Sequence, residues 1–237
     1  MAMRKALATM INNCPASATG AECEFCLEFS EACSSRFGLT YGDVTESRII
    51  AEQDGIVVLP TLGQLFVGSL LIMPRDHFET VAEIPERLLD GCFRLVAEFS
   101  ERLRAFGTSV VFEHGARSET ERSCGIYHAH LHLVPVPAEI SVEDALPNAG
   151  TEASTLEDAY DVLRDEDAYL LFRDTRKRTK YVIGAEAHSE IFRSQYFRKM
   201  LAAHFRLPSP WDWRAYQGIE SRVLNTLGAL QSHVAVR

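Results

Sequence analysis

The spacing of apolar residues changes along the chain, and each spacing predicts a type of element. Short apolar or alternating runs predict strands near residues 46–52, 56–60, 68–74 and 109–114. Between the third and fourth of these strands, Pro85 opens a long helix that reaches about Phe106. Its apolar residues recur at three-to-four spacing, and Gly107 ends it. The first half of the chain therefore predicts an antiparallel sheet with one long amphipathic helix.

The last third of the chain predicts a second group of elements. It consists of a hairpin with strands at 169–172 and 180–183 and a basic tip at 173–178, then helices at 195–205 and near 219–230. Ser194 is placed to cap the first of these helices. We expect an α+β fold: a sheet of about five strands with the long helix packed on it, plus a C-terminal α/β extension.

Charge and composition suggest where one region gives way to the next. Residues 137–168 hold ten acidic side chains and one basic, whereas residues 169–214 hold ten basic and four acidic. We therefore expect an N-terminal arm, a core domain, an acidic loop or linker with a short solvated helix near 156–163, and an extension packed on the core. Their ranges are 1–20, 21–137, 138–168 and 169–237. The basic block either faces phosphate or pairs with the acidic stretch.

Three histidines occupy alternate positions in the run Tyr127 to Pro135. His128, His130 and His132 are separated by Ala129 and Leu131, which is the periodicity of a strand. We expect all three imidazoles on one face and the apolar residues in the core. Histidine can serve near neutral pH as base, acid, nucleophile or metal ligand. The alternatives are a metal held by two of the three, or a polar face that satisfies itself.

This run resembles the signature of the histidine-triad (HIT) superfamily, in which three histidines alternate with apolar residues. The resemblance extends upstream, in the family's order, through the Cys-x-x-Cys at Cys23 and Cys26 and the Pro-x-x-His strand that ends at His77. It covers about residues 20–137. The resemblance implies a HIT-like antiparallel sheet with one long packed helix.

The resemblance also implies an activity. The middle histidine, His130, would attack phosphorus as a nucleophile, and His132 would contact the phosphoryl or leaving-group oxygen as hydrogen-bond donor or acid. The implied function is hydrolysis of a nucleotide or nucleotide-like phosphate ester, anhydride or phosphoramidate through a covalent His130 intermediate. The alternatives are a nucleotidyltransferase or phosphorylase with the same triad, and a non-catalytic nucleotide-binding protein.

In zinc-bearing relatives the metal ligands correspond to Cys23, Cys26, His77 and His128. Two thiolates and two imidazoles would make a closed tetrahedral zinc site, which is structural. The alternative is a pair of buried free cysteines, with His77 capping the next helical turn.

The resemblance is incomplete around the substrate. Thr61 stands where an acidic residue for ribose is usual, Gly125 where Ser or Thr is usual, and Glu113 where an asparagine is usual. We expect the substrate to meet Cys124, the amides near Gly125, and Glu113 with its neighbour His114. These departures make an ordinary adenosine nucleotide a poorer fit.

The extension suggests a lid over the pocket. Ser194, Gln195 and Arg198 stand at the start of a helix whose amide-rich N-terminus could face an anion. We therefore expect Ser194 and Gln195 to contact the substrate. The alternative is that they only cap their own helix.

Net charge narrows the range of partners. The chain has a formal charge of −9, no run of eighteen apolar residues and no signal-like start. We expect a cytoplasmic protein that binds a small nucleotide-like molecule, without long nucleic acid or membrane, and leave a homodimer open.

Overall fold

The computed structural model describes residues 23–117, 126–137, 150–185, 188–207, 211–213 and 220–231. Between Ser47 and Arg48 the chain divides into two compact units. The arm expected at residues 1–20 lies outside the described residues. No helix among the described residues is long and apolar enough to cross a membrane.

The first unit is helical in its described part. It contains α2 (Glu24–Ser30), the short 3-10 helix η2 (Ala32–Ser34) and α3 (Arg36–Tyr41). The Ser35 side chain caps α3 by accepting from the Gly38 amide, and Phe37 stacks on Tyr41 within the helix. The sequence pattern did not predict these helices.

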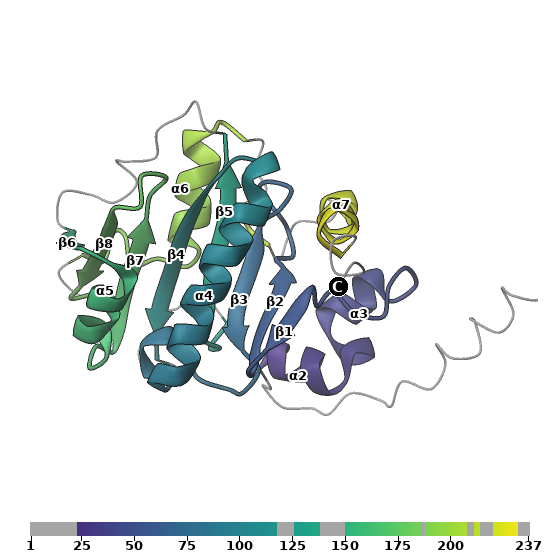
Figure 1. The fold of residues 1–237 in the computed structure, drawn as a ribbon, viewed down its shortest axis with the longest axis horizontal. Coiled ribbons are helices and arrows are strands. Elements are labelled where there is room, and N and C mark those ends of the chain that lie inside the picture. The colour runs from purple at the N-terminus through teal and green to yellow at the C-terminus, as the bar shows by residue number, and fades with distance from the viewer. Residues whose placement is uncertain are drawn as a thin grey trace, which may run out of the picture. The chain divides into compact units, whose positions relative to one another are not determined.

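The second unit is built on one antiparallel sheet of eight strands, ordered β1-β2-β3-β5-β4-β7-β8-β6 (Figure 1). The strands are β1 (Ala51–Gln53), β2 (Ile56–Pro60), β3 (Leu70–Pro74), β4 (Thr108–Ala116), β5 (Leu131–Val136), β6 (Thr151–Ala153), β7 (Ala168–Arg173) and β8 (Thr179–Ile183). The predicted α+β class and antiparallel sheet are confirmed. The extension does more than pack on this sheet, because β7 pairs with β4 and continues it.

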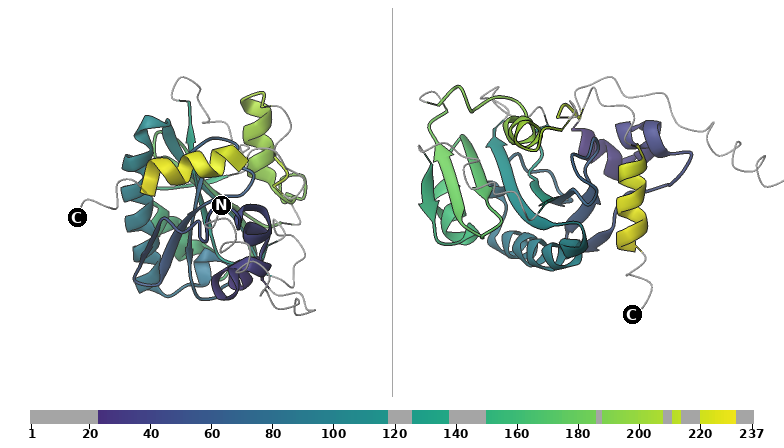
Figure 2. Two further views of the ribbon diagram at one scale, coloured as in Figure 1. Left: turned by 90° about the vertical axis from the view of Figure 1, so that its right-hand side faces the viewer. Right: turned by 90° about the horizontal axis from the view of Figure 1, so that it is seen from above.

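Helices cover both faces of the sheet. On one face lie α4 (Glu86–Arg102), continued by the short 3-10 helix η4 (Leu103–Ala105), and α5 (Leu156–Leu163). On the other lies α6 (Tyr196–His204) (Figures 1 and 2). The long predicted helix is therefore confirmed as α4, which buries an apolar stripe that includes Leu88, Leu95 and Phe99. On the α6 side, Phe197 packs between Phe112 of β4 and Phe172 of β7.

Gly107 explains how the chain turns from η4 into β4. Its φ is +146°, and a Cβ there would lie 2.3 Å from the carbonyl oxygen of Val136 on the neighbouring strand. Glycine is therefore required by both the backbone conformation and the close approach.

The last described helix, α7 (Glu220–Gln231), is fixed to the loop between β2 and β3. The Thr226 hydroxyl donates to the Gln64 side chain and accepts from the Gly68 amide, while Arg222 donates to the carbonyls of Gln64 and Leu65. Residues from the end of the chain thus satisfy buried polar groups of the core.

Three local expectations are corrected. The helix expected to be solvated, α5, buries Leu156, Ala159, Tyr160 and Leu163. The N-cap residue of α6 is Gln195, in a left-handed conformation (φ 60°), and its side chain makes no capping hydrogen bond, so the N-cap lies one residue after the expected Ser194. The strand expected through all three histidines begins only at Leu131.

Candidate active site

The three histidines lie where the chain enters β5. Only His132 belongs to the strand, and His128 and His130 precede it. Their segment is held by the Ala129 amide, which donates to the Phe78 carbonyl at 2.6 Å. The alternation survives without the strand, because the rings of His130 and His132 lie 5.0 Å apart.

His130 has a defined tautomer. Its Nδ1 lies 2.5 Å from the carbonyl oxygen of His128, and a carbonyl can only accept, so Nδ1 carries the proton. The neutral ring then has its lone pair on Nε2. The side chain is buried, with 8% of its surface exposed. This is the arrangement that a histidine nucleophile requires.

His132 lies in a mostly apolar setting on the same face. Its ring stacks on Phe112 at 4.4 Å between centroids, as expected from the register in which these two residues face each other. Burial, followed by the charges of His130 and Arg198, lowers the pKa of His132 well below its ordinary value. Its Nδ1 is buried without a hydrogen-bond partner among the described residues. His132 is therefore neutral near pH 7, with a nitrogen whose partner the described chain does not supply.

His128 faces a different neighbour. Its Nε2 donates to the Pro74 carbonyl at 2.9 Å, which leaves the lone pair on Nδ1. Its ring lies 5.3 Å from that of His77, edge to face, and the two side chains each offer a nitrogen within 4.8 Å of the other's. Burial lowers the pKa of His128 to about 4, and the charges of His130 and His77 act in the same direction. The hydrogen bond to Pro74 raises the pKa but does not offset burial, so the ring is neutral. Metal-binding histidines commonly donate their second nitrogen to a carbonyl in this way.

The two cysteines of the Cys-x-x-Cys motif form a pair within the first unit. Cys23 immediately precedes α2 and Cys26 lies in its first turn, which brings the two Sγ atoms within 4.8 Å. Neither forms a disulfide, and both are partly exposed. Each pair, two thiols and two imidazoles, supplies half of the donor set of a structural zinc site.

Glu113 does not have the substrate-binding position expected of it. Successive residues of β4 face opposite sides of the sheet, so Phe112 faces His132 while Glu113 faces the α4 and α5 side. Its carboxylate accepts from the Val81 amide, the Tyr160 hydroxyl and the Tyr169 hydroxyl. This expectation is corrected, because the carboxylate is committed to protein donors.

The remaining expected substrate contacts are only partly brought together. His114 shares the face of Phe112, and its ring lies 6.1 Å from that of Phe192. Gln195 is buried and bonds to Asp212 and to the Trp213 amide, so these contacts tie it to residues 211–213. Ser194 immediately precedes it. Cys124 and Gly125 lie outside the described residues.

Arg198, in the extension, acts electrostatically on His132. It is buried on α6, where it donates to the carbonyls of Gly63 and Trp211, and its charge contributes to lowering the pKa of His132. A cation held near His132 would favour an anionic ligand there.

Phe112, Tyr160 and Tyr169 were not predicted from the sequence. The role of Phe112 could have been predicted from the pattern, because a residue paired across an antiparallel ladder shares the face of its partner. The roles of the two tyrosines could not have been predicted, because only the tertiary fold brings α5 and β7 next to Glu113.

No family model matches this chain. Among curated proteins, the chain is similar to Protein hit of Bacillus subtilis (strain 168), with 21% identity over 98 residues. The match covers 40% of this chain and 64% of that protein, so the chain spans less than two thirds of the curated relative's length.

Several solved structures are similar over part of the chain. A zinc-bound histidine triad family protein from Mycobacterium smegmatis is 18% identical, with a TM-score of 0.37 over 60% of this chain and 91% of that one. A member of the HIT family from Bacillus subtilis is 18% identical, with a TM-score of 0.38 over 60% and 92%. The names of both proteins give the histidine-triad family, which is the family that the sequence motifs of this chain resemble.

Proposed function

We propose that this histidine-triad chain hydrolyses a nucleotide or nucleotide-like phosphate ester, anhydride or phosphoramidate through a covalent intermediate on His130. The observation that carries the proposal is the bond from His130 Nδ1–H to the His128 carbonyl. It fixes the tautomer in which Nε2 has the lone pair needed to attack phosphorus.

The chemistry proceeds in two displacements. Nε2 of His130 forms a bond to phosphorus while the bond from phosphorus to the leaving group breaks, and the leaving group takes a proton from solvent. Water then attacks the same phosphorus and releases a proton to solvent, the P–N bond breaks, and His130 returns to its neutral form. The charge that forms on His130 in the first step is stabilised by its carbonyl partner.

His132 fits the role of neutral hydrogen-bond donor better than that of cationic acid. Its low pKa keeps the ring uncharged near pH 7, and an uncharged imidazole still has one N–H to offer to a phosphoryl or leaving-group oxygen. Stacking on Phe112 fixes the plane of the ring. The structure thus favours one of the two roles that the resemblance left open.

Zinc is proposed as a structural cofactor. Cys23, Cys26, His77 and His128 would be its ligands, and a closed tetrahedral site of two thiolates and two imidazoles would stabilise the fold. The His128 tautomer supports this, because its proton is on Nε2 and its lone pair is on Nδ1.

The decisive experiment is to trap the intermediate. Wild-type protein is incubated briefly with a nucleoside phosphoramidate labelled on phosphorus, denatured at alkaline pH, and analysed by mass spectrometry for an adduct on the peptide that contains His130. His204→Ala, which removes an exposed histidine at the end of α6, is the matched control and should label like wild type. Binding of the nucleotide without any adduct or turnover would favour the non-catalytic protein. Faster decay of the adduct with phosphate than with water would favour the phosphorylase.

A further inference from the structure

Glu113 is a buried, hydrogen-bonded group that the proposed chemistry does not use. Three donors from three different elements converge on its carboxylate: the Val81 amide at 2.8 Å, the Tyr160 hydroxyl at 2.5 Å and the Tyr169 hydroxyl at 2.7 Å. Burial raises the pKa of both tyrosines well above the ordinary value of 10.0, so both hydroxyls keep their protons and donate. The carboxylate therefore joins α5 and β7 to the short 3-10 helix η3 (Val81–Glu83).

The position of Tyr169 depends on the residue opposite it. Gly115 on β4 pairs with Tyr169 on β7, and a Cβ at Gly115 would lie 2.3 Å from the tyrosine ring. The ring therefore lies directly against the backbone of β4. From there its hydroxyl both donates to Glu113 and accepts from the Ala82 amide at 3.1 Å.

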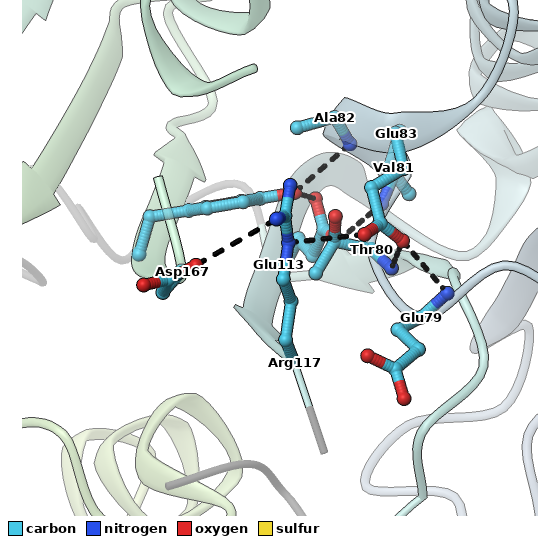
Figure 3. A network of polar contacts seen from close by, with 9 residues as sticks. Glu79, Thr80, Val81, Ala82, Glu83, Glu113, Arg117 and Asp167 are labelled. Carbon is cyan, nitrogen blue, oxygen red and sulfur yellow. Dashed lines mark hydrogen bonds and ion pairs between the residues drawn. The ribbon is translucent and has the colours of Figure 1, made fainter. Parts of the chain in front are cut away.

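A second connection joins the same two regions (Figure 3). The Arg117 side chain pairs with Glu83 at 3.0 Å and with Asp167 at 3.6 Å, and its amide donates to the Asp167 carbonyl. Glu83 in turn accepts from the amides of Glu79 and Thr80. The segment 79–83 is thus held by the start of β7 through two independent sets of contacts.

This segment also leads to the histidines. His77 and Phe78 immediately precede it, and the Phe78 carbonyl accepts from the amide of Ala129, the residue between His128 and His130. The His128 carbonyl that fixes the tautomer of His130 belongs to the same stretch of backbone. A displacement of segment 79–83 would therefore be passed to the acceptor on which the nucleophile depends.

We propose that Tyr160 of α5 and Tyr169 of β7, through Glu113, are positioning residues that hold segment 79–83 and with it the backbone of the histidine motif. This deepens the proposed function, on which its kinetic consequence rests. The extension would then be required for the geometry of the reaction centre, in addition to any contact it makes with the substrate.

The test compares hydroxyl deletions at matched tyrosines. Tyr160→Phe and Tyr169→Phe each remove one donor to Glu113 and keep the ring. Tyr181→Phe removes the hydroxyl of another buried tyrosine, on β8, that does not contribute to this network. Glu113→Gln keeps the side-chain volume and removes the charge, so it provides a second route should a tyrosine variant fold poorly.

The first readout is amide hydrogen exchange at Val81, Ala82 and Ala129, which needs no substrate. We expect exchange at all three to become about tenfold faster or more in Tyr169→Phe and Glu113→Gln, because the bonds that close this segment are lost. Tyr181→Phe should match wild type. Unchanged exchange at Ala129, with faster exchange confined to Val81 and Ala82, would overturn the proposal, since the network would then be only structural.

The second readout is steady-state hydrolysis. Misplacing the nucleophile should lower kcat about tenfold or more with KM changed less than about twofold, because the ground-state contacts to the substrate are retained. A rise in KM at constant kcat would contradict positioning. If wild type forms no adduct on His130, the proposed function fails, whereas the exchange measurements still decide whether the network holds the histidine backbone.

Discussion

Two buried polar clusters on opposite faces of β4 differ in how completely the protein satisfies them. On one face, the Glu113 carboxylate accepts from three donors. On the other, Phe112 supports His132, whose buried Nδ1 has no hydrogen-bond partner among the described residues. A buried polar group with its partners in place stabilises a fold, and one without them costs free energy. The difference separates a group that holds the fold from one that is available for chemistry.

The largest expected effect is the loss of the nucleophile. His130→Ala should lower turnover by about 10³-fold or more, because the covalent route disappears, while the midpoint of thermal unfolding changes little. Single-turnover kinetics and a circular dichroism melt would measure both. If more than a few per cent of wild-type turnover survived, His130 would not be the nucleophile. The face of β4 that carries His132 would then have no demonstrated catalytic role to set against the Glu113 cluster.

His132→Ala should have the next largest effect. We expect a loss of roughly 10²-fold for a substrate with a poor leaving group and a smaller loss for a good one, because the missing N–H stabilises charge on the departing oxygen or nitrogen. A series of aryl phosphate esters or phosphoramidates would show how the loss of rate depends on the pKa of the leaving group. Equal losses across the series would mean that His132 only binds the phosphoryl group.

The proposed zinc site leads to a prediction about stability. Cys23→Ser combined with Cys26→Ser should release zinc and lower the midpoint of thermal unfolding by about 5 °C or more, because the metal contributes directly to folding. Inductively coupled plasma mass spectrometry and calorimetry would test this. Cys92→Ala is the control: this thiol is buried on α4, so the variant should lose stability and retain zinc. Wild-type protein purified without any zinc would contradict the site.

The smallest effect concerns pH and Glu113. Burial raises the pKa of Glu113 from its ordinary 4.5, against the opposing effect of the three donors. The folded protein therefore keeps this proton to higher pH than the unfolded chain. The contribution of Glu113 is fully present below about 4.5 and is lost as the pH rises through the folded value.

Urea unfolding of wild type and Glu113→Gln, measured from about pH 4.5 upward, would isolate the contribution of Glu113 to stability. The difference in unfolding free energy, wild type minus variant, should fall as the pH rises. A difference that rises with pH would show that the donors outweigh burial and that the carboxylate is more stable ionised in the fold.

Local patterns were sufficient for much of this fold. Three-to-four spacing predicted α4, and two apolar runs around a basic tip predicted the pairing of β7 with β8, because both depend on neighbours in sequence. Asp174 explains the turn between those strands, since its carboxylate accepts from the amides of Arg176 and Arg178. The helices at 24–30 and 36–41 were not predicted.

The candidate site was harder to predict because it depends on distant pairings. The spacing of the histidines predicted a shared face for His130 and His132, and their rings do lie close together. The orientation of Glu113 followed from the same alternation along β4 and could have been predicted. Its hydrogen-bond donors could not have been predicted, because Tyr160 and Tyr169 are 47 and 56 residues away in the chain.

The pairing of β7 with β4 also determines which strands lie at the edges of the sheet, where another chain could add a strand. A strand at the edge of a sheet presents unpaired amides and carbonyls to any other chain, whereas a strand inside the sheet does not. With β7 in place, β4 lies inside, and the sheet of the described chain ends at β1 and β6. Removing residues 169–237 would leave one side of the nine-residue β4 without its partner. A truncated protein would then be prone to associate with itself through that strand. In this chain β7 prevents such association, because it pairs with the edge of β4 that would otherwise be exposed.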